Sequence, residues 1–369
     1  MGTEEHGLVS AIRDLLARAV PGAELLGLTR FGVDPNGAEG ACGTSKSVGY
    51  GEPLKLRVRG PDGRERSLVL HTARSDSFGH DRRADRAAAI LLGFDRFSSV
   101  KRHVRAIDVG AFTRDGNSSI SLSNAGELYL LTDYAEGRVY AEELRELARS
   151  GQPEPTHLGH VRALATLLAE IHAEQIDDPR RYRRSIRDLV GSGEGIFGMV
   201  DGYGPNVPSA SPERLAGIEA RAERWRFRLR AHEARLRRAH GDFHPFNILF
   251  NGDEISLLDT SRGSMADPAD DLTCLAINYV FFAVEQPESW VRAFRSLWYQ
   301  LWATYLELTG DSKVLEVAAP FLAWRGLVVA NPMWYPHVSP DSRDRVLRFV
   351  ERALDADRFD PGMADEVFR

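Results

Sequence analysis

The chain has 369 residues, of which 43% are hydrophobic and 27% are charged. This composition is that of a folded protein with enough apolar material for about two domains, and it excludes a disordered chain. With 47 Lys and Arg against 53 Asp and Glu, the formal net charge is −6, which excludes a globally basic nucleic-acid-binding protein. Any binding of polyanions would have to be local.

Cysteine usage and the N-terminus bear on the compartment. The chain has only two cysteines, Cys42 and Cys274, and no C-x-x-C pair, so the sequence indicates neither a disulfide framework nor zinc or redox chemistry. No apolar run approaches the roughly 18 residues that a membrane span requires, and the N-terminus is polar and acidic. We therefore expect a cytoplasmic protein that binds neither membranes nor nucleic acids.

The first third of the chain predicts a small α+β domain. Apolar residues at helical spacing indicate a helix near the N-terminus, and Gly-rich turns then separate short strand-like runs. The turns G-V-D-P-N-G and R-G-P-D-G-R favour three antiparallel strands. The expected elements in chain order are a helix over 8–19, strands over 24–30, 54–58 and 67–72, a helix over 82–97, and strands over 105–112, 119–123 and 128–134.

From about residue 141 onward the pattern is mainly helical. An i, i+3, i+4, i+7 stripe within L-A-T-L-L-A-E-I-H predicts a helix that is buried along one face. The stripe consists of Leu164, Leu167, Leu168 and Ile171. A highly charged helix is expected over 212–238, where i,i+4 pairing on a solvated face is a simpler interpretation than an anion-binding surface.

One segment carries the residues of a chemical reaction. H-G-D-F-H-P-F-N-I-L-F at 240–250 places Asn247 five residues after Asp242, and the apolar run I-S-L-L then leads to Asp259. Phosphoryl transfer needs this combination, because one carboxylate orients the attacking hydroxyl and accepts its proton while an amide oxygen and a second carboxylate hold Mg²⁺. Hard oxygen ligands suit that ion.

Two other interpretations of this segment are weaker. A zinc site would use its histidines, but His240 and His244 are followed by no third soft ligand at a fitting spacing. Ordinary turn and capping residues are the second alternative, because Asp and Asn occupy many loops for local hydrogen-bonding reasons.

Four segments occur in the order of a known family. H-G-D-F-H-P-F-N and L-L-D-T-S-R-G-S-M-A-D-P-A-D-D-L match the loop H-G-D-x-H-x-x-N and the segment I-D-x-x-x-x-x-x-x-D-P-x-x-D-L. L-A-T-L-L-A-E-I-H resembles the helix before that loop, and L-Y-L-L-T-D-Y-A-E-G resembles a hinge between two lobes. By these motifs, which span about residues 40–280, the chain resembles the aminoglycoside phosphotransferase and choline kinase group of small-molecule kinases. Their order argues against a chance set of turn residues.

The resemblance implies roles for particular residues. Asp242 would be the catalytic base, and Asn247 and Asp259 would be the magnesium ligands. The backbone around Asp133 and Ala135 would contact adenine.

Further residues have a structural and a functional interpretation side by side. By the resemblance, His240 orients the loop by hydrogen bonding, and Asp271 braces it from the following helix. Arg262 either clamps an anionic substrate group or pairs with Asp267. The segment 324–337, W-R-G-L-V-V-A-N-P-M-W-Y-P-H, either lines a substrate cleft or packs in the core as a helix and its cap.

The sequence departs from the family in its phosphate grip. The family expects a Lys on the third strand, paired with a Glu from the next helix, but His71 stands at the Lys position and Asp85 is the best equivalent of the Glu. Imidazole is shorter than a lysine side chain and mostly neutral at about pH 7 unless neighbouring groups raise its pKa. A protonated His71, Arg74 at the strand end, or Lys46 in the Gly-rich loop could supply the missing charge. The loop residues whose backbone N–H groups could bind phosphate are Gly43, Thr44 and Ser45.

We therefore predict an α+β, bilobal protein-kinase-like chain. A small antiparallel-sheet lobe, residues 1–134, would bind nucleotide, and a larger helical lobe, residues 135–369, would hold the catalytic loop and the substrate cleft. By the resemblance, the enzyme transfers the γ-phosphate of ATP, or of GTP, with Mg²⁺ to a hydroxyl of a small molecule. The alternatives are a catalytically impaired pseudokinase-type nucleotide-binding protein, because of His71, and transfer of AMP. The sequence identifies neither the substrate nor the oligomeric state.

Overall fold

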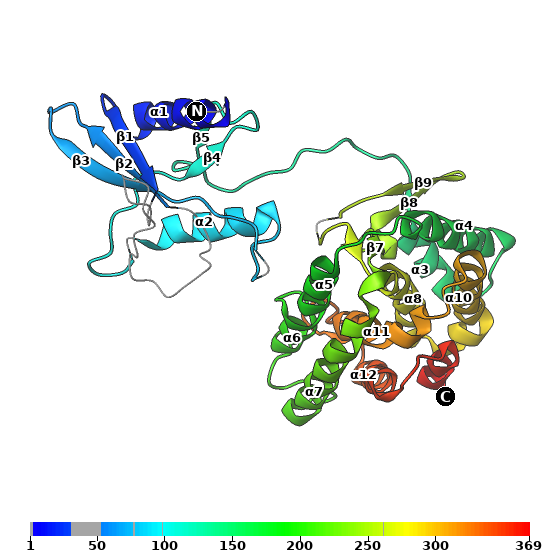
Figure 1. Cartoon of the computed structure of the whole chain (residues 1–369). Coiled ribbons are helices and arrows are strands. Elements are labelled where there is room, and N and C mark those ends of the chain that lie inside the picture. The colour runs from blue at the N-terminus through cyan, green and yellow to red at the C-terminus, as the bar shows by residue number, and fades with distance from the viewer. Residues whose placement is uncertain (1–2, 31–52, 77, 98, 261) are drawn as a thin grey trace. The chain divides into compact units, whose positions relative to one another are not determined.

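The computed structural model describes residues 3–30, 53–76, 78–97, 99–260 and 262–369. The chain divides into two compact units, Met1–Thr132 and Asp133–Arg369 (Figure 1). The predicted lobe boundary after residue 134 lies close to this division. Each unit is described by itself.

The N-terminal unit is built on an antiparallel sheet of order β1-β2-β3. Its strands are β1 (Glu24–Arg30), β2 (Leu54–Arg59) and β3 (Glu65–Leu70). In β2 the residues Leu54, Leu56 and Val58 are buried while the charged residues between them are exposed, as expected for a sheet with one covered face. Helix α1 (Thr3–Ala19) covers that face, because its buried Ile12 and Leu16 join the same apolar cluster.

The rest of this unit consists of α2 (Arg83–Phe97) and a short hairpin of β4 (Gly110–Phe112) and β5 (Ser119–Ser121). Asp14 of α1 accepts hydrogen bonds from the Ser118 hydroxyl (2.6 Å) and the Ser119 backbone N–H (2.8 Å), which attaches the hairpin to the helix. These bonds hold the pKa of Asp14 well below its ordinary value. A mainly apolar cavity of about 930 Å³ lies between α1, β3, α2 and the segment 104–112.

The prediction of a strand over 128–134 is wrong. These residues have no regular secondary structure, and the side chains of Tyr129 and Leu131 are 92% and 88% exposed. An apolar and aromatic pattern forms a strand only where a neighbouring strand pairs with its backbone, and this segment lacks that partner within the described residues. The predicted strands 105–112 and 119–123 form, but only as the three-residue β4 and β5.

The C-terminal unit is mainly helical, as predicted. Its helices and 3₁₀ or π turns are α3 (Tyr140–Ser150), α4 (Pro155–His172), α5 (Pro179–Gly191), α6 (Ile196–Asp201), α7 (Pro212–Leu229), η1 (Arg230–Arg235), η2 (Pro245–Asn247), α8 (Ala269–Val284), α9 (Pro287–Ser289), η3 (Trp290–Phe294), α10 (Arg295–Thr309), α11 (Val314–Ala330), α12 (Pro340–Asp355) and η4 (Pro361–Phe368). The charged helix expected over 212–238 is thus shorter than predicted, since α7 ends at Leu229.

Helices α8 and α11 form the centre of this unit. Nearly every residue of both helices is buried, and they pack against each other. A helix that is apolar all round is typical of a core position. Helix α4 packs against α10, and of the predicted apolar stripe Leu164 and Leu168 are fully buried. No helix in the described ranges is long and apolar enough to cross a membrane.

Short strands frame the loop that carries Asp242 and Asn247. The sheet β6-β8-β9 contains β6 (Arg138–Val139), β8 (Ile248–Asn251) and β9 (Glu254–Leu257), and β7 (Arg237–Arg238) pairs with β10 (Met265–Ala266). In the β8–β9 hairpin Ile248 lies opposite Leu257, and the Leu258 N–H donates to the Asn247 carbonyl at 2.9 Å. This register places Asp259 beside the end of the loop that carries Asn247.

Truncating Leu168 tests the packing of α4 on the core. Leu168→Ala removes a fully buried side chain, and we expect it to lower the free energy of unfolding by about 2–5 kcal/mol. Thr166→Ala, on the exposed side of the same helix, should change it by less than about 0.5 kcal/mol. Urea unfolding followed by circular dichroism measures both, and equal effects would contradict the assigned buried face.

Candidate active site

The loop between β7 and β8, which carries the predicted catalytic residue Asp242, is held by a buried carboxylate. Asp271, in the first turn of α8, accepts hydrogen bonds from the backbone N–H groups of His240 (2.6 Å) and Gly241 (2.8 Å). Its other contact is the His172 Nε2 atom at 3.2 Å, and the Nδ1 atom of that ring is bound to the Tyr305 hydroxyl at 2.8 Å. Asp271 therefore braces the loop from α8, and α4 and α10 support it from behind.

The loop needs glycine at position 241. Gly241 has φ 86°, and a Cβ atom there would lie 2.5 Å from the Gly263 carbonyl oxygen. The backbone of the loop thus passes directly against the segment that precedes β10. His240 contributes a local bond as well, because its Nδ1 atom accepts from the Asp242 N–H at 3.3 Å.

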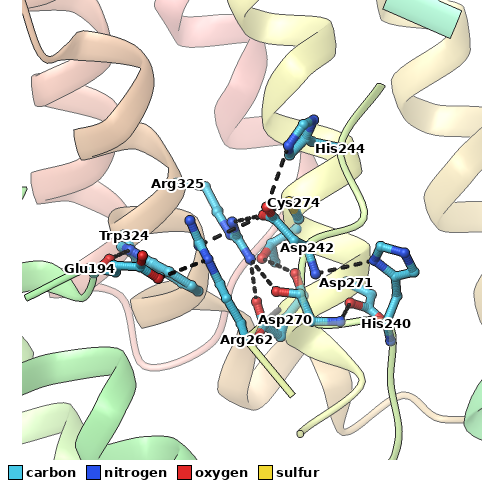
Figure 2. A network of polar contacts seen from close by, with 12 residues as sticks. Glu194, His240, Asp242, His244, Arg262, Asp270, Asp271, Cys274, Trp324 and Arg325 are labelled. Carbon is cyan, nitrogen blue, oxygen red and sulfur yellow. Dashed lines mark hydrogen bonds and ion pairs between the residues drawn. The ribbon is translucent and has the colours of Figure 1, made fainter. Parts of the chain in front are cut away.

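Asp242 lies at the centre of a cluster of cations and is only 6% exposed. Its Oδ1 atom is 2.8 Å from Nη1 of Arg325, 3.7 Å from Nη1 of Arg262 and 3.8 Å from Sγ of Cys274. Its Oδ2 atom faces Nε2 of His244 at 3.4 Å. Figure 2 shows Arg325 and Arg262 on one side of the carboxylate and His244 on another.

These neighbours fix the charge of Asp242. Burial alone would raise the pKa of this carboxyl, but the hydrogen bond with His244 and the charges of Arg325 and Arg262 outweigh it, so the pKa lies well below its ordinary value. Asp270, next to Arg325, behaves in the opposite way. Burial, opposed in part by Arg325, and the like charge of Asp271 raise its pKa to about 6. At neutral pH the loop carboxylate is therefore ionised.

Asn247 and Asp259 offer oxygen atoms suited to Mg²⁺. The Asn247 amide nitrogen donates to the Asp242 carbonyl at 3.1 Å, which orients the amide. Asp259 is exposed and has φ 51°, a left-handed conformation that Asp tolerates better than most residues. One amide oxygen and one carboxylate fit an ion that takes few protein ligands and completes its shell with phosphates and water.

Arg262 pairs with residues other than the predicted Asp267. The Asp267 carboxylate is bound by Arg235, with Nε and Nη2 at 2.8 and 2.9 Å. The Arg262 guanidinium instead lies 4.9 Å from the centre of the Trp324 ring and 3.3 Å from a Glu194 carboxylate oxygen. It thus belongs to the surroundings of Asp242.

Arg325 is the residue that the sequence analysis missed. It appears there only as part of the segment 324–337, yet its side chain is buried and contacts Asp242 directly. A usable signal exists, because Arg325 is the one basic residue of the apolar helix α11. A charge in such a helix requires a buried partner. The same segment also contains exposed Met333 and Trp334, so it is neither wholly core nor wholly surface.

The residues predicted to bind the nucleotide phosphates belong to the first third of the chain, and only some of them lie in the described ranges. Gly43, Thr44, Ser45 and Lys46 lie outside the described residues. His71 directly follows β3 and lines the cavity of the N-terminal unit. Asp85, in the first turn of α2, binds the Arg82 side chain at 2.8 Å and its backbone N–H at 3.0 Å.

The expected hinge residues belong to the other unit. Asp133 and Ala135 stand at the start of the C-terminal unit, in a segment without regular structure.

The family profile decides the assignment. The profile of the phosphotransferase enzyme family APH matches residues 58–308, more than half of the chain. The chain belongs to this phosphotransferase family. The match confirms the predicted family and the protein-kinase-like fold, with its N-terminal antiparallel sheet and helical C-terminal region. It also confirms, at the level of the family, the predicted enzyme, a small-molecule kinase that uses ATP.

Solved structures of kinases resemble the chain over most of its length. A glucosamine kinase in complex with glucosamine, ADP and inorganic phosphate is 15% identical, with 94% of this chain and 99% of that chain covered and a TM-score of 0.42. An ethanolamine kinase from Plasmodium vivax is 12% identical, with 90% and 83% covered and a TM-score of 0.37. A choline kinase from Cryptosporidium parvum Iowa II is 12% identical, with 97% and 92% covered and a TM-score of 0.31. No curated protein sequence matches the chain at a significant level.

Replacing Asp271 tests the brace of the phosphotransferase loop. Asp271→Asn keeps the shape but removes the charge that two backbone N–H groups and His172 contact. We expect a loss of about 1.5–3 kcal/mol in the free energy of unfolding at pH 7, the usual value of hydrogen bonds to a charged group. Asp253→Asn, in the exposed β8–β9 turn, is the matched control.

The same variant has a defined pH dependence. Burial would raise the pKa of Asp271, but bonds from His172 and from the loop N–H groups hold it below its ordinary value. The stabilisation is therefore fully present above about pH 4 and is lost as the pH falls further. The difference between wild type and Asp271→Asn should shrink below about pH 4 in urea unfolding experiments, and a difference that grows there would contradict the brace.

Proposed function

We propose that this phosphotransferase moves the γ-phosphoryl group of ATP to a hydroxyl of a small molecule, with Asp242 as the acceptor of the hydroxyl proton. The observation that supports this most is the ionised, buried carboxylate of Asp242 in the same loop as Asn247. The register of the β8–β9 hairpin adds Asp259 to them. A base and two oxygen ligands are the groups that phosphoryl transfer asks of a protein.

The transfer is a single displacement. The acceptor oxygen forms a bond to the γ-phosphorus while the bond from that phosphorus to the β,γ-bridging oxygen breaks, and ADP leaves with the electron pair. The hydroxyl proton passes to the Asp242 carboxylate. Because the pKa of Asp242 is low, this proton moves late, when the acceptor oxygen has gained positive character. A late proton transfer suits the loose transition state of phosphoryl transfer.

Asn247 and Asp259 would hold Mg²⁺. The bound ion would neutralise charge on the nucleotide phosphates. In the N-terminal unit, we assign the phosphate contacts to the backbone of Gly43, Thr44 and Ser45 and to the side chains of Lys46 and His71, with Asp85 as the acidic residue of α2. We assign the adenine contact to the backbone of Asp133 and Ala135, at the start of the C-terminal unit. The low cysteine content fits action in the reducing cytoplasm.

Asp242→Asn tests the catalytic assignment. The amide has nearly the same shape but accepts no proton, so we expect product formation to fall by about 10²–10⁴-fold. Nucleotide binding should remain. Amino sugars, amino alcohols, sugars and nucleosides serve as acceptors, with phosphorylated product detected by mass spectrometry and Asp253→Asn as the control. If Asp242→Asn forms product at the wild-type rate, Asp242 is not the proton acceptor.

Asp259→Ala tests the metal assignment without turnover. A ligand that binds only the folded protein raises its melting temperature, so ATP should stabilise the wild type more strongly when Mg²⁺ is present. Asp259→Ala should lose the magnesium-dependent part and keep the rest, as measured by thermal shift with ATP and GTP. The exposed Glu254→Ala in the same hairpin should behave as wild type. The metal assignment fails if Asp259→Ala retains the full magnesium effect.

One observation favours a second function. Because His71 replaces the strand lysine, a pseudokinase-type protein that binds nucleotide without transfer is the alternative. It predicts magnesium-dependent stabilisation by ATP and no phosphorylated product from any acceptor, for wild type and Asp242→Asn alike.

A further inference from the structure

Helix α11 carries a buried cation in an otherwise largely apolar sequence. The sequence V-L-E-V-A-A-P-F-L-A-W-R-G-L-V-V-A is apolar except for Glu316 and Arg325, and Arg325 is only 5% exposed. Burying a guanidinium among apolar side chains costs several kcal/mol unless carboxylates compensate it. The contacts that compensate Arg325 therefore indicate its role.

Arg325 joins α11 to both the catalytic loop and α8. Its Nη1 atom donates to Asp242 Oδ1 at 2.8 Å, and its Nη2 atom donates to Asp270 Oδ1 at 2.8 Å and to the Gly241 carbonyl at 3.2 Å. The guanidinium carbon lies 3.8 Å from the centre of the Trp324 ring, which restricts the plane of the group. Neutralisation by Asp270 alone would involve none of the loop atoms. Two of the three bonds reach the loop.

The two oxygens of Asp242 consequently have different surroundings. Oδ1 receives the buried Arg325 bond, with Arg262 and Cys274 further away. Oδ2 faces His244, whose side chain is partly exposed. The Nδ1 atom of that ring accepts the Phe246 N–H at 3.2 Å, so in the neutral ring the proton is on Nε2, directed at Oδ2. Oδ1 is thus bound by the buried Arg325, and Oδ2 faces the partly exposed side chain of His244.

We propose that Arg325 is a positioning residue for Asp242, which holds Oδ1 so that Oδ2 receives the proton of the acceptor hydroxyl. This inference rests on the proposed function. Arg325 touches neither substrate nor nucleotide in this scheme and acts through the carboxylate. A carboxylate free to rotate would misplace its acceptor oxygen, and a misplacement of about 1 Å can cost about 10²-fold in rate.

Two substitutions of Arg325 test the proposal. Arg325→Met removes both bonds to the loop, and we expect kcat to fall by about 10²-fold, while the KM for ATP changes less than about twofold. Arg325→Lys keeps a cation that can compensate the two carboxylates but cannot form the fork of bonds, and should give an intermediate kcat. Phosphorylated product and ADP release are measured for each variant, together with the melting temperature.

Arg214 supplies a matched control. It also bridges two carboxylates, Asp344 at 2.6 Å and Glu351 at 2.7 Å, but it joins α7 to α12 and makes no contact with the catalytic loop. Arg214→Met should lower the melting temperature and leave kcat unchanged. A purely structural role for Arg325 would give the same result.

A double substitution separates positioning from an independent effect. If Arg325 acts only through Asp242, adding Arg325→Met to Asp242→Asn should lower the residual kcat no further, because residues that act as a unit are not additive. An equal fractional loss in both backgrounds overturns the proposal. So does a folded Arg325→Met or, if that variant does not fold, an Arg325→Lys enzyme with kcat within about twofold of wild type.

The failure of the proposed function has a different signature. If the wild type neither phosphorylates an acceptor nor hydrolyses ATP, the proposed function fails and the role of Arg325 in catalysis fails with it. Wild-type turnover that is insensitive to Arg325 overturns the positioning role alone.

Discussion

The hydrogen bonds between the Asp271 carboxylate and the backbone of His240 and Gly241 are the contact on which the active site depends. The carboxylate stands at the start of α8, a helix of the core in which nearly every residue is buried. Bonds from a side chain to backbone N–H groups fix the path of the loop independently of its side chains. These hydrogen bonds therefore help to position Asp242 and Asn247, which follow in the same loop.

The position of Asp271 brings it close to other buried carboxylates, which repel one another. Neighbouring cations compensate these charges to different extents. Asp242, Asp270 and Asp271 bring three carboxylates into a buried region, and the Arg325 guanidinium lies between two of them. Burial and the like charge of Asp271 raise the pKa of Asp270 to about 6, whereas the hydrogen bond with His244 and the charges of Arg325 and Arg262 hold that of Asp242 below its ordinary value. Of the two carboxyls that Arg325 contacts, Asp270 is therefore the one whose pKa is raised. The loop carboxylate keeps its charge.

The sequence predicted correctly those elements and site residues that depend on neighbours close along the chain. The H-G-D-F-H-P-F-N loop and Asp259 could be located because their spacing along the chain is that of the family motif. The strand over 54–58 was predictable because a one-sided sheet alternates apolar and polar residues. The strand over 128–134 was mispredicted because pairing depends on a neighbour that no local pattern reveals.

Arg325 illustrates the second kind of limit. It lies 83 positions from Asp242 in sequence, and only the packing of α11 on α8 brings the two together. The sequence did show one basic residue in an apolar helix, which predicts a buried ion pair without naming the partner. Arg262 shows the same ambiguity, because the nearby Asp267 was a plausible partner until Arg235 was found to occupy it.

The residues that depart from the family motifs and the residues that match them lie in different units. His71 and Asp85 belong to the N-terminal unit, whereas Asp242, Asn247, Asp259 and their supports all belong to the C-terminal unit. The bonds that order the catalytic loop come from α4, α8 and α11, so a change in the phosphate grip leaves them unaltered. The replacement of the family's lysine by His71 is therefore confined to the N-terminal unit. Asp242, the proposed proton acceptor, takes its charge from neighbours within the C-terminal unit, so the His71 replacement is no argument against that part of the proposal.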